Sequence, residues 1–317
     1  MGMFQRVRNW FDAGVPSGRA PAVPRSRSSG KAEVLEIHAS VATNPGCVRT
    51  ENQDAAIFSR PADDRALATH GVIALVADGM GGCNGGEVAS ALACEKIPRV
   101  YFASNGPAPA ALRASLEAVN GEIYQAAQAQ PNLRGMGTTA VAFAITSSHG
   151  WLAYVGDSRL YLIRRGQIYR MSEDHSMVFE MVHKGLLTAE EARNHADRNV
   201  LSRALGSRPQ VEVSCWEEPF PIQAGDRFLL CSDGLHDLVT DEKMLALARS
   251  GELSAATERL VRTANENGGY DNISVILLEA VDAAALRSRP RPTREYPQPG
   301  LSKSASPTRM AATITSR

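Results

Sequence analysis

The segment 160–171, LYLIRRGQIYRM, restricts the folds open to this chain more than any other stretch. Two runs that alternate between apolar and polar residues are separated there by Arg165 and Gly166, a pair that suits a tight turn. Strands joined by a tight turn lie antiparallel, because parallel neighbours need a long crossover connection. The segment therefore predicts antiparallel sheets rather than a parallel, doubly wound sheet.

Further short runs rich in Val, Ile, Tyr and Phe are typical of strands, and longer helical patterns come in pairs between them. The expected strands are 35–43, 55–59, 72–77, 138–145, 151–156, 211–217, 227–233 and 273–281. The expected helices are 86–103 and 108–129 in one pair, and 240–249 and 254–267 in the other. A more polar helical segment, 176–205, which we call the insert, interrupts the strands. This order predicts an α+β fold in which helices cover stacked sheets.

The two ends of the chain differ in composition from its middle. Residues 1–32 and 283–317 are rich in Pro, Ser, Gly and Arg, so we expect two disordered basic tails around one folded domain, 33–282. The formal net charge of the 317-residue chain is +0, and the folded domain is therefore acidic. An acidic domain argues against nucleic acid as the main ligand and is compatible with cation binding.

Cysteine spacing and hydropathy indicate the compartment. The five cysteines lack the short spacings of a zinc site, and no secretory signal is evident. No apolar run approaches the roughly 20 residues that cross a bilayer. We therefore expect a cytoplasmic protein with reduced thiols and no transmembrane segment.

Aspartates stand at the ends of several expected strands. They are Asp54, Asp78, Asp157, Asp233 and Asp271. Each one alone is an ordinary turn former. If several strand ends converge, however, their like charges need cations to neutralise them, and carboxylate oxygens favour Mg²⁺ or Mn²⁺.

Seven motifs follow one another in an order found in one family of enzymes. They are GCVRTENQDA (46–55), VADGMGG (76–82), GTTA (137–140), VGDSRLY (155–161), DHS (174–176), LLCSDGLHDLV (229–239) and YDNISVI (270–276). Together they resemble the metal-dependent protein phosphatases of the PPM, or PP2C-like, family in its bacterial branch. The resemblance covers nearly all of 33–282. It implies a four-layer α-β-β-α sandwich of two mainly antiparallel sheets, with the insert as a flap beside the active site.

The resemblance also implies a site for two Mg²⁺ or Mn²⁺ ions. Asp78 would bridge the two ions, and the carbonyl of Gly79 would add a ligand to one of them. Asp233 and Asp271 would complete the other. Asp157 would bind a third, weaker ion used in turnover or substrate handling.

Two further residues would serve catalysis by the same resemblance. Asp54 would hold metal-bound water by hydrogen bonds, and Arg49 would grip the substrate phosphate with its planar guanidinium. The implied reaction is hydrolysis of phosphoserine and phosphothreonine by direct attack of a hydroxide shared by two ions. Met80 stands where many eukaryotic members have a histidine proposed to protonate the leaving group, so no general acid is evident.

Two other functions stay open at this point. A hydrolase of a small phosphorylated molecule would need the same ligands, and an inactive regulatory module could share the fold. The intact set of expected ligands disfavours the inactive module, and the insert and acidic surface favour protein substrates. We therefore expect a monomer that acts on phosphorylated proteins and opposes a bacterial Ser/Thr kinase.

Overall fold

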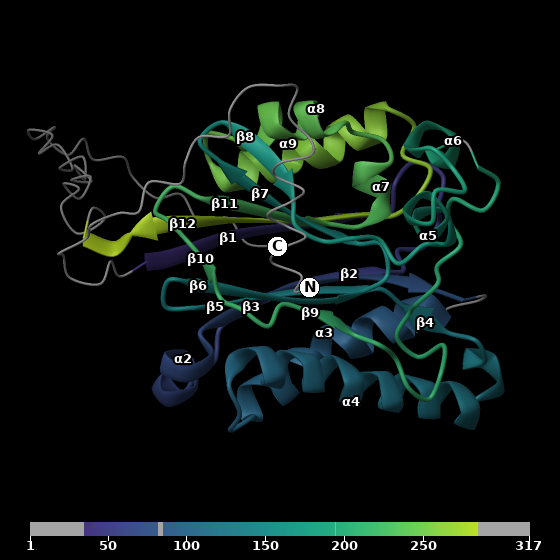
Figure 1. Ribbon diagram of the computed structural model, residues 1–317, viewed down its shortest axis with the longest axis horizontal. Helices are drawn as coiled ribbons and strands as arrows, with labels where there is room; N and C mark the ends of the chain where they lie inside the picture. Colours follow the sequence, from purple (N-terminus) through teal and green to yellow (C-terminus); the bar gives the residue numbers. More distant parts are fainter. Residues whose placement is uncertain (1–34, 82–84, 194, 285–317) are drawn as a thin grey trace, which may run out of the picture.

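The computed structural model describes residues 35–81, 85–193 and 195–284 (Figure 1). The predicted tails, 1–32 and 283–317, lie almost entirely outside these ranges, as do Gly82 and Cys83. Within the described ranges, no helix combines the length and apolar character that crossing a bilayer requires.

Five antiparallel strands form one sheet, in the order β1-β12-β11-β7-β8. They are β1 (Leu35–Asn44), β7 (Arg159–Arg164), β8 (Gln167–Arg170), β11 (Arg227–Cys231) and β12 (Ile273–Asp282). The hairpin expected at 160–171 is β7 and β8, and its turn holds Arg165 at φ 52° and Gly166 at φ 77°. Positive φ at both central residues matches the twist of the flanking strands.

A second antiparallel sheet has seven strands. Its main path is β10-β6-β5-β3-β2, with β4 beside β3 and β9 beside β6. The strands are β2 (Asp54–Ser59), β3 (Val72–Met80), β4 (Gly137–Thr138), β5 (Ala140–Thr146), β6 (His149–Val155), β9 (Ser214–Cys215) and β10 (Phe220–Pro221). The first six residues of β3 are buried, because β3 is a central strand covered on both faces.

Helices cover the outer face of each sheet (Figure 1). The seven-stranded sheet carries α3 (Gly85–Ala103) and α4 (Ala108–Ala129), and the five-stranded sheet carries α8 (Asp241–Ala248) and α9 (Leu253–Glu266). The remaining helices are α2 (Asp64–His70), η1 (Pro131–Leu133), α5 (Met177–His183), α6 (Ala189–Arg193) and α7 (Asp233–His236). The predicted α+β sandwich of two antiparallel sheets flanked by helices is confirmed.

The apolar core is divided among the three interfaces between these layers. Between the sheets, Phe143 of β5 lies against Phe228 of β11 with ring centroids 4.6 Å apart. Separate clusters fill the spaces between each sheet and its own helices. The alternation of inward and outward apolar residues therefore fixes how the sheets stack.

Two local expectations differ from the structure. The strand expected at 211–217 is reduced to Ser214–Cys215, because this segment follows β6 over only two residues. The helix α2 was not expected, since it has seven residues and a mostly exposed surface. Asp63 caps it by accepting a 2.8 Å hydrogen bond from the backbone N–H of Ala66.

Candidate metal and phosphate site

The antiparallel pairing of β2 and β3 brings two of the predicted aspartates together. Asp54 is the first residue of β2, Asp78 lies near the end of β3, and the two face each other in register. The hydroxyl of Thr139 accepts a 2.9 Å hydrogen bond from the backbone N–H of Asp78 and holds this strand end in place. The pair therefore depends on sheet register.

Three further aspartates come from segments that end beside this pair. Asp233 begins α7 directly after β11, Asp157 follows β6, and Asp271 precedes β12. The Asp157 carbonyl is 3.1 Å from Nε2 of His236, which lies at the end of α7. The loop after β6 is thus tied to the helix that carries Asp233.

The aspartate side chains are close enough to perturb one another. The side chains of Asp78 and Asp233 are close enough for each to change the pKa of the other. Burial raises the pKa of Asp78 well above its usual value, and the charges of Asp54, Asp233 and Asp157 raise it further. Burial followed by the charge of Asp233 also raises the pKa of Asp157. Such a group needs protons or cations to neutralise it.

Asp54 is held by a buried serine that lies just after β11 and before α7. The hydroxyl of Ser232 donates a 2.7 Å hydrogen bond to Oδ2 of Asp54 and accepts one of 3.0 Å from the backbone N–H of Ser274. Burial raises the pKa of Asp54 to about 7, against the lowering effect of the Ser232 hydrogen bond. In the metal-free protein, Asp54 therefore takes up a proton more readily than a carboxylate in water does.

The donor set fits hard divalent cations. Oδ1 of Asp54 and Oδ1 of Asp233 are both buried without a hydrogen-bond donor. Buried carboxylate oxygens normally have a hydrogen-bond donor or a cation as their partner. We therefore expect these two oxygens to bind a cation or a proton. Oxygen ligands in this number suit Mg²⁺ or Mn²⁺.

One carboxylate oxygen of Asp271 is paired with Arg49. Nη2 of Arg49 lies 2.9 Å from Oδ2 of Asp271, while Oδ1 accepts a 2.9 Å hydrogen bond from the backbone N–H of Asn272. Across the described part of the chain, no three His, Cys, Asp or Glu side chains are already arranged as a complete ligand set. The structure brings Asp54, Asp78, Asp157 and Asp233 together. Asp271 is paired with Arg49, and its charge also raises the pKa values of Asp54 and Asp233.

Asn272 fixes the loop that carries Arg49. Its side-chain N–H₂ donates to the carbonyls of Pro45 and Glu51 at 3.0 and 2.8 Å. Its side-chain oxygen accepts a 2.8 Å hydrogen bond from the backbone N–H of Gln53. Asn272 is buried, so both ends of the loop are anchored to the start of β12.

Gly79 is required by a close approach of backbones. A Cβ there would lie 2.1 Å from the carbonyl oxygen of Gly86 and 2.4 Å from that of Gln53. At Gly79 the neighbours are the start of α3 and the chain before β2.

His175, the histidine of the DHS motif, has a structural place. Its Nδ1 accepts a 3.1 Å hydrogen bond from the backbone N–H of Gly156, and Nε2 lies 2.9 Å from the hydroxyl of Ser214. Its ring stacks on Tyr154 with centroids 5.0 Å apart. Burial lowers the pKa of His175 to about 4, so the ring is neutral at physiological pH.

Sequence reasoning missed the polar residues that hold these aspartates. They are Thr139, Ser232 and Asn272. Ser232 and Asn272 stand next to predicted ligands in the chain, which is a usable signal. Their partners lie in distant segments, so the sequence does not show what they bind.

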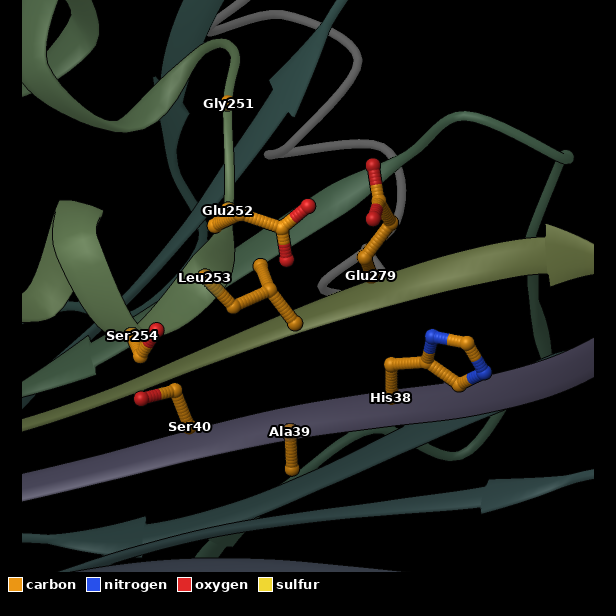
Figure 2. A pocket seen from close by; sticks show the side chains of 8 residues that line it. All are labelled: His38, Ala39, Ser40, Gly251, Glu252, Leu253, Ser254 and Glu279. Atoms are coloured by element: carbon orange, nitrogen blue, oxygen red, sulfur yellow. The ribbon is translucent and has the colours of Figure 1, made fainter. Parts of the chain in front are cut away.

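A separate polar cavity of about 300 Å³ lies between β1, β12 and the connection from α8 to α9. Figure 2 shows Glu252 and Glu279 above the β1 side chains His38 and Ser40. Glu279 is paired with Arg227 at 2.9 Å. None of the predicted site residues lines this cavity.

Comparison with known proteins identifies the family to which this chain and its fold belong. The family model described as protein phosphatase 2C matches residues 49–277. A serine/threonine phosphatase of Listeria monocytogenes is 37% identical over 249 residues, which cover 77% of this chain and 96% of that protein.

Solved structures agree. The serine/threonine phosphatase PstP/Ppp of Mycobacterium tuberculosis has a TM-score of 0.69 and 33% identity, covering 78% of this chain and 99% of that one. A structure of the PstP catalytic domain in complex with two manganese ions has a TM-score of 0.66 and 32% identity, over 78% of this chain and 100% of that one. This chain belongs to the protein phosphatase 2C family.

Proposed function

We propose that this protein is a metal-dependent phosphatase that hydrolyses phosphoserine and phosphothreonine in other proteins. The observation that carries the proposal is the group of four aspartates with raised pKa values and two buried carboxylate oxygens that lack donors. Membership of the protein phosphatase 2C family and relatives named as serine/threonine phosphatases support it.

In this proposal, Asp78 and Asp233 would hold two Mg²⁺ or Mn²⁺ ions, and the Gly79 carbonyl would be a further ligand of one ion. Asp271, whose Oδ2 is paired with Arg49, would complete the set. Asp157 lies close enough to Asp233 to contribute to a third, weaker ion. Bound divalent ions lower the pKa of water and neutralise phosphoryl oxygens.

The remaining steps belong to side chains of the chain itself. Arg49 exchanges its ion pair with Asp271 for the substrate phosphate, which its guanidinium can bind through two parallel hydrogen bonds. Asp54, held by Ser232, accepts hydrogen bonds from water in the site. His175 does not donate the leaving-group proton, because burial keeps its pKa at about 4.

The cellular setting is part of the same proposal. We infer a cytoplasmic monomer that opposes a Ser/Thr kinase, as expected from the sequence. Tests of these points are the elution volume of the purified chain and its action on autophosphorylated kinase.

The testing experiment is phosphate release from phosphothreonine peptides in Mn²⁺, with excess EDTA as the reference. The proposal predicts peptide hydrolysis that EDTA abolishes and that Asp78→Asn reduces by at least about 100-fold. Asp64→Asn, an exposed aspartate of α2, is the matched control and keeps the wild-type rate. Hydrolysis of small phosphoesters alone would instead favour a small-molecule phosphatase.

A further inference from the structure

Two loop segments of the chain, 47–49 and 269–271, run side by side at Arg49. The backbone N–H of Cys47 donates a 2.6 Å hydrogen bond to the carbonyl of Gly269, and Arg49 is paired with Asp271 at 2.9 Å. Val48 and Tyr270 are the residues between these two connections. They therefore stand next to the group that is proposed to bind the phosphate.

Both intervening side chains expose apolar surface. Val48 is 67% exposed and Tyr270 is 44% exposed. Large exposed hydrophobic side chains are few in the described part of the chain. Three others, Met177, Leu186 and Val200, belong to the insert. Apolar surface is thus concentrated on the loops beside Arg49 and on the insert, which fits contact with a partner.

We propose that Val48 and Tyr270 form a recognition surface for an apolar side chain of the substrate, two residues from the phosphorylated serine or threonine. The inference rests on the proposed function and names the peptide class that the site prefers. The proposed occupant of this surface is a segment of a phosphopeptide, because the surface is continuous with Arg49 and Asp271.

The position follows from the geometry of an extended peptide. Successive side chains of such a peptide point to opposite faces, so the residues two positions away face the enzyme together with the phosphoresidue. They lie about 6.6 Å along the chain from it. Val48 and Tyr270 are the chain neighbours of Arg49 and Asp271, so a side chain on the same face of the peptide as the phosphoresidue is the one expected to reach them.

The test is a set of phosphothreonine peptides in a serine background, with Leu or Ser placed one or two positions before or after the phosphoresidue. The wild type is expected to give a kcat/KM about fivefold higher for Leu than for Ser at one of the two-residue positions. The readout is the Leu/Ser ratio within each variant. If a variant disturbs Asp271, kcat/KM falls by the same factor for the Leu and the Ser peptide. This effect therefore cancels in the ratio.

Three variants separate recognition from structure. In Val48→Ser combined with Tyr270→Ala, the ratio falls to about 1, because the apolar surface is removed. Tyr270→Phe keeps the ring and retains the wild-type ratio. Val41→Ser, which alters a residue of β1 that is 41% exposed, is the matched control and also retains it.

Two outcomes would overturn the inference. Equal kcat/KM for the Leu and Ser peptides with the wild type would refute it and leave the phosphatase assignment standing. A ratio that survives in the double variant would do the same. If no phosphopeptide is hydrolysed while a small aryl phosphate is, the proposed function fails as well.

Discussion

The hydroxyl of Ser232 donates a 2.7 Å hydrogen bond to Oδ2 of Asp54 and so joins the end of one sheet to the start of a strand in the other. Both residues are buried. Because Ser232 lies directly before Asp233, this bond sets the position of two aspartates at once. It ties the geometry of the site to the stacking of the sheets.

Replacing Ser232 by alanine is expected to destabilise the fold. Oδ2 of Asp54 and the backbone N–H of Ser274 would both lose their partner, and an unsatisfied buried group costs about 1–3 kcal/mol. Urea unfolding of the metal-free protein measures the loss. Ser254→Ala, at an exposed position of α9, is the control and should change the free energy of unfolding by less than about 0.5 kcal/mol. An equally small change in the free energy of unfolding for Ser232→Ala would show that this hydrogen bond contributes little to stability.

Protonation of the aspartates predicts how pH affects metal-free protein. Because the folded-state pKa of Asp54 is raised to about 7, the folded protein binds more protons than the unfolded chain between about pH 4 and 7. The contribution of Asp54 to the free energy of unfolding therefore increases as pH falls through that window and decreases as pH rises. Asp78, Asp157 and Asp233 act in the same direction.

Thermal unfolding in EDTA from pH 5.5 to 7.5 tests this account. His175 contributes with the opposite sign, since its pKa is lowered and its stabilisation is lost as pH falls. The comparison is therefore made with Asp54→Asn, which keeps His175 and removes one raised carboxyl. We expect the variant to gain stability relative to wild type as pH rises, and parallel pH profiles would contradict the assignment.

Gly79 and Gly121 should respond in opposite ways to alanine. At Gly79 a Cβ would meet two backbone carbonyl oxygens, at 2.1 and 2.4 Å, and overpacking of this kind costs about 1–3 kcal/mol or more. At Gly121, inside α4, a Cβ meets nothing within 4 Å, so alanine should stabilise by about 0.5–1 kcal/mol. Denaturant midpoints of the two variants measure both effects. Tolerance of Gly79→Ala would mean that α3 can move away from β3 at no cost.

Features set by neighbouring residues could be predicted from the sequence. The hairpin at 160–171 depends on Arg165 and Gly166, and the two long helices of the first pair follow their own periodicity. The motifs likewise located the five aspartates. These signals are local, so one sequence is sufficient to read them.

Features set by distant contacts could not be predicted. The register that places Asp54 opposite Asp78 depends on the alignment of β2 relative to β3. The pairing of Arg49 with Asp271 joins segments 222 residues apart. The reason for Gly79 likewise lies in the approach of α3. None of these long-range contacts can be identified from the residues that are nearby in the chain.

Arg49 should act mainly on substrate binding. Its side chain is 56% exposed and contacts no aspartate other than Asp271 among its ion pairs in the described structure. Arg49→Ala is expected to raise KM for a phosphopeptide by about 10-fold or more, because a charge-assisted hydrogen bond contributes about 1.5–3 kcal/mol. Arg49→Lys should recover only part of this, since an amine lacks the planar fork. An unchanged KM in Arg49→Ala would remove this residue from the phosphate site.

Calorimetric titration of Mn²⁺ into metal-stripped protein, with no substrate present, tests directly whether the aspartates bind the metal. Wild type and Asp64→Asn are expected to bind Mn²⁺ alike, and Asp78→Asn and Asp233→Asn are expected to lose at least about tenfold in affinity. Circular dichroism spectra identical to wild type would show that the variants are folded. Unchanged Mn²⁺ affinity and stoichiometry in both Asp78→Asn and Asp233→Asn would contradict the claim that these aspartates form the metal site.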